Sequence, residues 1–319
     1  MEYLTENNHG QTKIAGDDNA GYTRKGETYF TIKHLSSFSG VKPHTIRIWE
    51  QRFPFLRPQR TEASRRLYTP RQVTLFLQVC LLKQNGYRLN HIASMKPDET
   101  SAVIAGINGS QKFTRIVYDL ISSMAAMEIS HFSTVLDECV YKWGIHETIK
   151  FIVIPFSEKV GLFDSPERKT YSRNIFLVLE CIKQKIYLAI ESATSAVIPG
   201  RQTTVLLFLS GSSAELPLLY LHYLIKKEGY TTIYLGKYFS IDELDMICKQ
   251  KAPDYIVTHL QGNHRENDLS DFIKCLPAYL PGTHILSAGR SLSADINVNY
   301  YRHADNFTDI ITSLNRFRA

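Results

Sequence analysis

The sequence predicts a multidomain protein of the α and α/β classes. A winged helix-turn-helix comes first, a four-helix bundle second and a Rossmann-like parallel α/β domain third. Three observations predict this order along the 319 residues. Basic side chains concentrate early in the chain, apolar residues then recur at three- and four-residue steps, and from Gln202 short apolar runs alternate with amphipathic helices. The last pattern is typical of a parallel sheet with helices packed on it.

Composition shifts divide the chain into five segments. Residues 1–26 are polar and show no apolar period, which predicts a disordered tail. Residues 27–96 are compact and basic, and residues 97–111, with Pro97, Gly106 and Gly109, resemble a linker. Residues 112–200 have a helical period, and residues 201–319 form the α/β domain.

Neither a membrane span nor a secretory leader is expected. No segment has the roughly 18 unbroken apolar residues of a membrane helix, and no charged start is followed by an apolar run. The five cysteines are scattered without a CxxC pair, which fits reduced, mostly buried thiols. These features predict a cytoplasmic protein with no membrane partner.

The positive charge of the chain is concentrated in residues 41–71. This segment holds two acids, Glu50 and Glu62, and eight basic residues: Lys42, Arg47, Arg52, Arg57, Arg60, Arg65, Arg66 and Arg71. Eight minus two is +6, which equals the net charge of the whole chain. A basic segment on an otherwise neutral body is the electrostatic footprint of a protein that binds a polyanion.

The same segment has the pattern of a helix-turn-helix. A short helix at Thr31–Ser37 is followed by the turn Ser39-Gly40-Val41 and by a second helix from Pro43 to about Gln51. The second helix is expected to expose His44, Thr45 and Arg47 and to bury Ile46 and Trp49. Arg52–Leu67, which is rich in arginine, is predicted to form a wing along DNA phosphates, and Thr69-Pro70 begins a third helix that ends at Asn85-Gly86.

Three stretches in this order resemble the MerR family of bacterial regulators. They are TIKHLSSFSGVKPHTIRIWEQR at Thr31–Arg52, RRLYTPRQV at Arg65–Val73 and LLKQNGYRLNHIASM at Leu81–Met95. The resemblance implies that the second helix enters the major groove and that the wing grips the backbone. The implied contacts are His44, Thr45 and Arg47 in the groove, and Arg65, Arg66 and Tyr68 around the wing. Arg52 and Arg60 of the arginine-rich segment are further candidate DNA contacts. Trp49 departs from the tyrosine that many relatives carry and is expected to pack in the core.

The resemblance also implies partners. Operators in this family are pseudo-palindromic, so a homodimer or tetramer on double-stranded operator DNA is expected, with RNA polymerase as a further candidate partner. An alternative for Arg52 and Arg57 is solvated surface charge without a DNA contact.

The α/β domain is predicted unit by unit. Its strands are expected at Thr204–Leu209, Thr232–Leu235, Tyr255–His259 and His284–Ser287, and its helices at Ala214–Glu228, Ser240–Lys251, Leu269–Leu280 and Phe307–Phe317. In such sheets ligands bind beyond the carboxyl ends of the strands. The candidate pocket residues at those ends are Ser210, Gly211, Ser213, Gly236, His259 and Gly289.

A helical bundle followed by this α/β pattern resembles the cobalamin-binding module of the light-responsive carotenoid-gene regulators. That module implies an E-x-H-x-x-G loop whose histidine ligates cobalt, and a Trp and a Glu-His pair in the bundle. Here the histidine position holds Ala214 and the glycine position Pro217, no Trp follows Val160–Phe163, and the Glu-His pair falls near Ile175-Phe176. Three determinants are missing together, so no cofactor is expected, with cobalamin bound without the histidine ligand as the alternative.

Other kinds of site have little support in the sequence. No cysteine pair follows the third helix, and His146-Glu147 would point apart on a helix, so no metal is expected. No nucleophile elbow, HExxH motif or phosphate loop occurs, so no enzyme is predicted. The prediction is a MerR-type regulator whose C-terminal module senses or dimerises. Two alternatives stay open: a true cobalamin or light sensor, and a protein-interaction module with a collapsed pocket.

Overall fold

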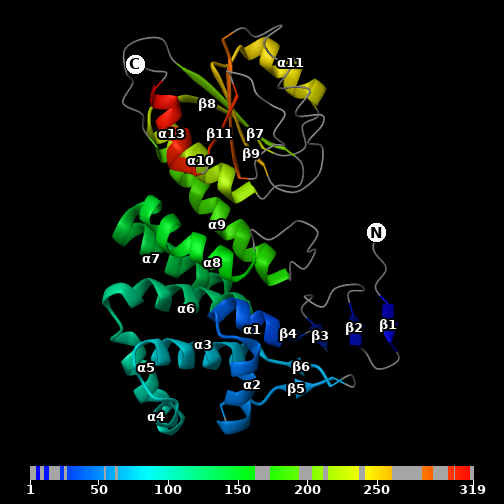
Figure 1. The fold of residues 1–319 in the computed structure, drawn as a ribbon, viewed down its shortest axis with the longest axis vertical. Coiled ribbons are helices and arrows are strands. Elements are labelled where there is room, and N and C mark those ends of the chain that lie inside the picture. Colours follow the sequence, from blue (N-terminus) through cyan, green and yellow to red (C-terminus); the bar gives the residue numbers. More distant parts are fainter. Residues whose placement is uncertain are drawn as a thin grey trace. The chain divides into compact units, whose positions relative to one another are not determined.

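The computed structural model describes residues 5–7, 11–13, 22–24, 27–53, 55–61, 64–161, 173–193, 203–210, 215–236, 241–260, 282–289, 301–304 and 306–316. The chain divides into two compact units, residues 1–182 and residues 183–319 (Figure 1). The first unit contains the predicted DNA-binding segment together with most of the predicted helical bundle. The second unit contains the α/β domain and the second half of the helix before it.

The N-terminal segment contains short strands where a disordered tail was predicted. Strands β1 (Thr5–Asn7), β2 (Gln11–Lys13), β3 (Tyr22–Arg24) and β4 (Glu27–Tyr29) pair in sequence order as an antiparallel meander. Strands of three residues are too short to show an apolar period. Backbone pairing, which composition does not reveal, is what defines them.

The helix-turn-helix has the predicted form. Helix α1 (Ile32–Ser39) starts at a capping box formed by Thr31 and His34, and helix α2 (Pro43–Arg52) carries Pro43 in its first turn. Between them Gly40 has a φ of 78°, in the left-handed region that glycine adopts without steric cost. The turn prediction is therefore confirmed at the residue that makes it.

A two-stranded hairpin follows, as predicted for a wing. Strands β5 (Gln59–Arg60) and β6 (Arg66–Leu67) pair antiparallel, with Arg60 opposite Arg66. Helix α3 (Pro70–Gln84) begins at a second capping box, Thr69 with Gln72, and helix α4 (Leu89–Ser94) follows it. A backbone bridge between Phe30 and Tyr68 ties the start of the domain to the base of the wing.

The predicted linker contains a helix. Helix α5 (Pro97–Ala105) uses Pro97 in its first turn and carries Asp98 and Glu99 there, and a 3-10 turn, η1 (Gly109–Gln111), follows. Proline restricts the interior of a helix but suits its start, and acidic residues stabilise that end. Pro97 and Gly106 were interpreted as residues that prevent a helix, whereas they mark its first residue and its C-cap.

Four helical stretches follow, and the last of them extends from the first unit into the second. They are α6 (Lys112–Ala126), the stretch from α7 (Ile129–Thr148) through the π-helix η2 (Ile149–Val153) to α8 (Ile154–Lys159), which Gly144 divides in two, and α9 (Arg173–Ser192). Gly144 has φ 77° and ψ 164°, outside helical values. Helix α6 packs against α3, so the bundle and the DNA-binding segment share one packed body.

The second unit is a parallel five-stranded sheet in the order β11-β10-β9-β7-β8. Its strands are β7 (Thr204–Ser210), β8 (Thr231–Gly236), β9 (Tyr255–Leu260), β10 (His284–Gly289) and β11 (Tyr301–Ala304). Renumbered along the chain this is 2-1-3-4-5, the flavodoxin-like variant of the doubly wound fold. The Rossmann-like prediction is confirmed, and β11 is a fifth strand that the sequence pattern did not distinguish from a loop.

Helices cover both faces of this sheet. Helices α10 (Glu215–Lys227) and α13 (Phe307–Arg316) share one face, where Leu218, Leu221 and Leu314 join the core with alternate strand residues. Helix α11 (Ile241–Lys251) lies on the other side (Figure 1), as right-handed crossovers in opposite directions require. The predicted helix at Leu269–Leu280 lies outside the described residues.

Candidate nucleic-acid interface

The basic segment has an almost entirely exposed set of cations. Seven of its eight basic side chains are exposed: Lys42, Arg47, Arg52, Arg57, Arg60, Arg65 and Arg71. They come from the start and end of α2, the wing and the start of α3. Exposed cations keep their hydration and can exchange it for phosphate oxygens, so this surface suits a polyanion.

Helix α2 separates its polar and apolar faces as predicted. His44 and Arg47 are exposed and Thr45 is half-buried, whereas Ile46 is fully buried. Trp49 is 8% exposed, and its ring lies 6.0 Å from the ring of Phe76 on α3. Packing of Trp49 in the core is confirmed, and the three polar residues near the N-terminus of α2 are left facing outward.

The structure places the eighth cation, Arg66, and Tyr68, both predicted DNA contacts, against the side chain of Glu50. The Nε of Arg66 donates to Oε2 of Glu50 at 2.7 Å, and the hydroxyl of Tyr68 donates to Oε1 of the same carboxylate. Tyr68 has no exposed surface in this structure. Burial, followed by the bond to Glu50, raises the pKa of Tyr68. We call Glu50, Arg66 and Tyr68 the Glu50 cluster.

The Glu50 cluster connects the wing to helix α2 of the helix-turn-helix. Glu50 belongs to α2, whereas Arg66 lies in β6 and Tyr68 directly after it. The carboxylate side chain is 8% exposed, so both of its oxygens are bonded in a largely water-free setting. The cluster therefore fixes the wing against α2. The sequence offered no signal for it because the partners stand 16 and 18 residues apart.

Toward the tip of the wing two hydrogen bonds join Thr61 and Arg65. The amide of Thr61 donates to the carbonyl of Arg65 at 3.0 Å, and the amide of Arg65 donates to Oγ1 of Thr61 at 3.1 Å. Ser64 takes the left-handed region with a φ of 56°. Arg60 and Arg65 are thus held on a defined hairpin with exposed side chains.

The carboxyl edge of the sheet in the second unit has a different character. Ser210, Gly236 and Gly289 end β7, β8 and β10 as expected, and Gly211 and Ser213 lie outside the described residues. His259 is 9% exposed, on the sheet face that carries α10 and α13, and its ring lies 6.3 Å from that of Phe307. Its Nδ1 has no hydrogen-bond partner among the described residues, and burial lowers the pKa of His259 to about 4.

A second carboxylate gathers donors at this edge. Glu215, the first residue of α10, accepts bonds from Lys183 Nζ at 3.2 Å, Tyr187 Oη at 3.3 Å and Tyr234 Oη at 3.1 Å. Lys183 and Tyr187 come from α9 and Tyr234 from β8, so three elements meet at one side chain. We call these four residues the Glu215 cluster. Burial, with Glu215 next, raises the pKa of Tyr234.

His222, which belongs to α10, does not fit a cobalt ligand. Its Nε2 lies 2.8 Å from Thr232 Oγ1, and its ring stacks on Tyr234 with ring centroids 5.1 Å apart. Burial lowers the pKa of His222 to about 4. Glu215 is bonded to three donors of its own chain. Sequence reasoning missed this cluster because Glu215 had no expected partner within its own helix.

Two further observations concern the described residues as a whole. No described helix is both long and apolar enough to span a membrane. No three His, Cys, Asp or Glu side chains come together as a metal set within the described ranges. The Nε2 of His146 lies 3.9 Å from Oε1 of Glu147. Cys80, Cys139, Cys181 and Cys248 are buried free thiols, as predicted, and Cys275 lies outside the described residues.

Known proteins resemble this chain along most of its length. The HTH-type transcriptional repressor CarH of Myxococcus xanthus is 23% identical over 263 residues, which are 80% of this chain and 86% of the relative. The HTH-type transcriptional repressor CarA of the same organism is 24% identical over 228 residues, 70% of this chain and 74% of the relative.

Solved structures give only partial likenesses. The monomethylamine corrinoid protein of Methanosarcina barkeri matches 64% of this chain and 99% of its own, with a TM-score of 0.47 and 11% identity. The methanol:cobalamin methyltransferase complex MtaBC of the same organism matches 74% of this chain and 91% of its own, with a TM-score of 0.34 and 12% identity. The fold assignment here rests on the strand order itself.

A family model covers the segment that carries the exposed cations. Residues 30–98 match the MerR HTH family regulatory protein model. The match includes α1, α2, the wing, α3 and α4, which are the elements described above as a helix-turn-helix with a hairpin. Residues 30–98 are therefore a MerR-type helix-turn-helix domain.

Proposed function

We propose that this protein is a MerR-type transcriptional regulator that binds double-stranded operator DNA through residues 27–96. The observation that carries the proposal is that the eight cations of residues 41–71 differ in exposure and in bonding. Seven are exposed around α2 and the wing, whereas the eighth is used with Glu50 to hold those two elements together. Such a surface presents exposed positive charge to DNA on a rigid support.

Within this surface the side chains have different roles. His44, Thr45 and Arg47 lie near the N-terminus of α2, where a recognition helix meets base edges, so we assign them to sequence choice. Arg52, Arg60 and Arg65 lie at the end of α2 and on the wing, and we assign them to phosphates. Base contacts set specificity, whereas phosphate contacts set affinity and its dependence on salt.

We propose that operator binding uses two copies of the chain. A recognition helix reads one half-site, and paired half-sites one helical turn apart need two helices related by symmetry. Dimers and tetramers both satisfy this requirement. Sedimentation of the protein with and without an operator fragment distinguishes the two states.

The second unit is proposed as a cobalamin-domain-like scaffold that assembles or regulates the protein without a cobalt-ligating histidine. The Glu215 cluster supports this proposal because its four side chains satisfy one another at the edge where such modules hold their ligand. A cobalamin sensor without the histidine ligand is the second candidate, favoured by the similarity to CarH and CarA over 70% or more of the chain.

One experiment tests these proposals together. Purified protein is titrated with an operator fragment at fixed salt, with and without adenosylcobalamin, in the dark and in light. We expect specific binding whose affinity adenosylcobalamin leaves unchanged, and a protein peak in gel filtration that carries no cobalamin absorbance. Coloured protein with a shifted affinity establishes the second candidate. Binding that does not discriminate the operator from random DNA of equal length contradicts the regulator.

A further inference from the structure

A cavity of about 250 Å³ lies within the first unit between helices α3, α5 and α6. Its lining consists of Thr74, Leu77, Gln78 and Leu81 from α3, Ser101, Ile104 and Ala105 from α5, and Arg115, Tyr118, Asp119 and Ser122 from α6. None of these residues belongs to the proposed DNA contacts or to the carboxyl edge of the sheet. The volume is slightly below the usual range of small-molecule sites, which leaves room for a compact ligand.

The walls of the cavity differ in chemistry. The α3 and α5 walls contribute apolar surface from Leu77, Leu81 and Ile104, of which the two leucines are almost fully buried. The α6 wall contributes Arg115 and Asp119, one helical turn apart, together with the ring of Tyr118. A ligand that fits has an apolar body and one polar end that faces α6.

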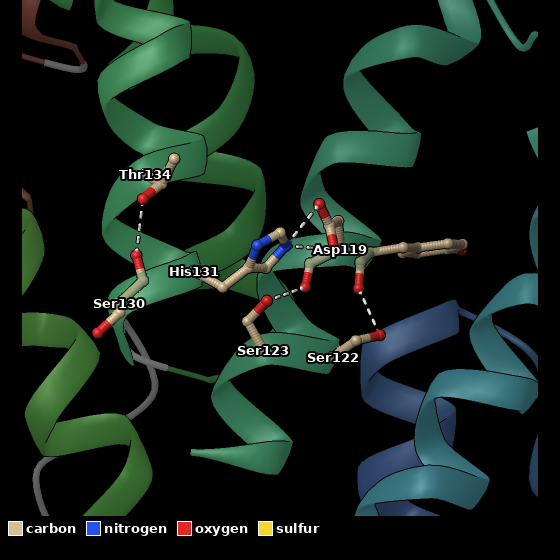
Figure 2. A network of polar contacts seen from close by, with 7 residues as sticks. Asp119, Ser122, Ser123, Ser130, His131 and Thr134 are labelled. Atoms are coloured by element: carbon tan, nitrogen blue, oxygen red, sulfur yellow. Dashed lines mark hydrogen bonds and ion pairs between the residues drawn. The ribbon is translucent and has the colours of Figure 1, made fainter. Parts of the chain in front are cut away.

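The two charged residues on the α6 wall differ in their hydrogen bonding. Asp119 is already met by His131 of α7, whose Nε2 lies 3.2 Å from Oδ1 and 3.4 Å from Oδ2 (Figure 2). Arg115 has a buried Nε that donates to no acceptor among the described residues. A guanidinium does not lose its proton in proteins, so this N–H calls for an acceptor, and a carboxylate is the acceptor that matches its geometry best.

Tyr118 connects the cavity to the helix-turn-helix. Its hydroxyl donates to the carbonyl of Ser39 at 3.4 Å and accepts from Nε2 of Gln84 at 3.3 Å. Ser39 is the last residue of α1, directly before the left-handed Gly40 that turns the chain into α2. One side chain therefore lines the cavity and bonds to the turn that positions the recognition helix.

The same junction is reinforced from α8. The Nζ of Lys159 lies 5.5 Å from the ring centroid of Tyr118, and the hydroxyl of Ser37 donates to the carbonyl of Lys159 at 2.6 Å. Tyr118 is therefore connected to α1 in two ways. It bonds directly to Ser39, and it contacts Lys159 of α8, whose carbonyl accepts a bond from Ser37. Packed elements of this kind transmit small shifts because their interiors do not deform continuously.

We propose that the cavity between α3, α5 and α6 is an effector site for a small carboxylate with an apolar body, bound by Arg115 and transmitted to the α1–α2 turn through Tyr118. The binding half of this inference stands on the cavity and Arg115 alone. The transmission half rests on the proposed function, since its output is the affinity for operator DNA.

Binding is tested on the full chain by nuclear magnetic resonance of the arginine Nε–H groups. Sodium benzoate and sodium hexanoate serve as probes, and benzamide and hexanamide serve as their neutral counterparts. The Arg115 resonance, assigned by its loss in Arg115→Lys, is expected to shift saturably with the two carboxylates and at least tenfold more weakly with the amides. A resonance that no probe moves, or that both amides move equally well, overturns the site.

A second variant tests the cavity without altering Arg115. Ala105→Leu adds side-chain volume on the α5 wall, so it is expected to weaken benzoate and hexanoate binding at least tenfold while the Arg115 resonance remains visible. Unchanged binding in this variant places the probes elsewhere and overturns the proposal.

Transmission is tested with Tyr118→Phe, which keeps the ring against the cavity and removes the hydroxyl. Benzoate, added to each protein at a concentration that saturates its own Arg115 shift, is expected to change the operator affinity of the unaltered protein at least threefold and to leave that of Tyr118→Phe unchanged. If benzoate binds at Arg115 without any change in operator affinity, the transmission is wrong. If the protein binds no operator at all, the proposed function fails while the Arg115 shift still decides the site.

Discussion

Two carboxylates, Glu50 in the first unit and Glu215 in the second, collect similar partners in different contexts. Each accepts a bond from one cation and from at least one tyrosine, and each joins elements that are far apart in sequence. Around Glu50 seven further cations remain exposed, so the cluster acts as a support for charge that faces outward. Around Glu215 the cluster occupies the edge where this type of sheet binds ligands.

The two clusters differ in how much charged surface remains exposed around them, and that exposed surface is what can bind a partner. The Glu50 cluster uses one arginine and leaves an electrostatic surface intact. In the Glu215 cluster Lys183 and Glu215 are each 16% exposed, so both charges are largely withdrawn from solvent. A ligand arriving at that edge would have to replace bonds that the chain already makes, which costs free energy.

The largest effect is expected from Glu50→Gln. The change removes the charge that faces Arg66 and places an amide donor next to the hydroxyl of Tyr68, in a site where Glu50 is 8% exposed. We expect a loss of about 3 kcal/mol in the free energy of unfolding of the first unit. Urea unfolding followed by tryptophan fluorescence measures it.

Glu138→Gln is the matched control for this variant. Glu138 also faces a cation, Lys142 at 3.3 Å, but its side chain is 62% exposed, so its loss is expected to change stability by less than about 0.5 kcal/mol. Equal losses in Glu50→Gln and Glu138→Gln would remove the structural role of the Glu50 cluster. Operator affinity should fall only in Glu50→Gln, because the wing is then no longer fixed to α2.

Glu215→Gln is expected to destabilise the second unit by about 2 kcal/mol and to leave the first unit unchanged. The variant loses the charge opposite Lys183 and weakens the bonds from Tyr187 and Tyr234. Hydrogen exchange resolved by peptide reports the two units separately. Increased exchange in α1 and α2 at the level seen in α10 would contradict the division into independent clusters.

Acid is expected to act on the second unit through its buried histidines. His222 and His259 both have a pKa of about 4 in the fold, below the ordinary value of 6.5, because burial disfavours the charged ring. The unfolded chain therefore binds protons first. The stability present above pH 6.5 is lost as the pH falls toward 4, at up to about 1.4 kcal/mol per pH unit for each histidine.

His259→Phe separates the two contributions. Within the part of the chain that the structure describes, the Nδ1 of His259 has no hydrogen-bond partner, so a phenyl ring loses no bond at that atom. The acid-induced loss of stability should therefore shrink by about half. Thermal unfolding between pH 4 and pH 7, followed by circular dichroism, measures the slope. An unchanged slope would show that neither the depressed pKa of His259 nor its burial governs the acid response.

The smallest effect distinguishes Arg65 from Arg66. Arg65 is exposed on the wing, so Arg65→Ala is expected to weaken binding to all DNA sequences about tenfold and to reduce the salt slope by about one. Arg66 is bonded to Glu50, so Arg66→Ala should lower stability and keep the salt slope. Fluorescence anisotropy of a labelled operator at several salt concentrations measures both. Identical salt slopes in the two variants would contradict the assignment.

Local features of the chain were predictable because their causes are close in sequence. Gly40 permits the turn, Pro43 and Thr69 begin helices, and the alternation of apolar runs with amphipathic helices specifies a parallel sheet. The exposed face of α2 also followed from the helical period. The short strands of residues 5–29 and the helix at Pro97–Ala105 were missed, because composition alone does not distinguish a breaker from a boundary.

The sequence by itself determined that a basic helix-turn-helix precedes a helical region and a parallel α/β domain. Tertiary structure alone decided which polar side chains are available. Burial of Tyr68, capture of Arg66 by Glu50 and the gathering of donors around Glu215 depend on contacts across 16 or more residues. Such contacts leave no periodic trace in a sequence, since chain folding rather than local propensity brings the partners together.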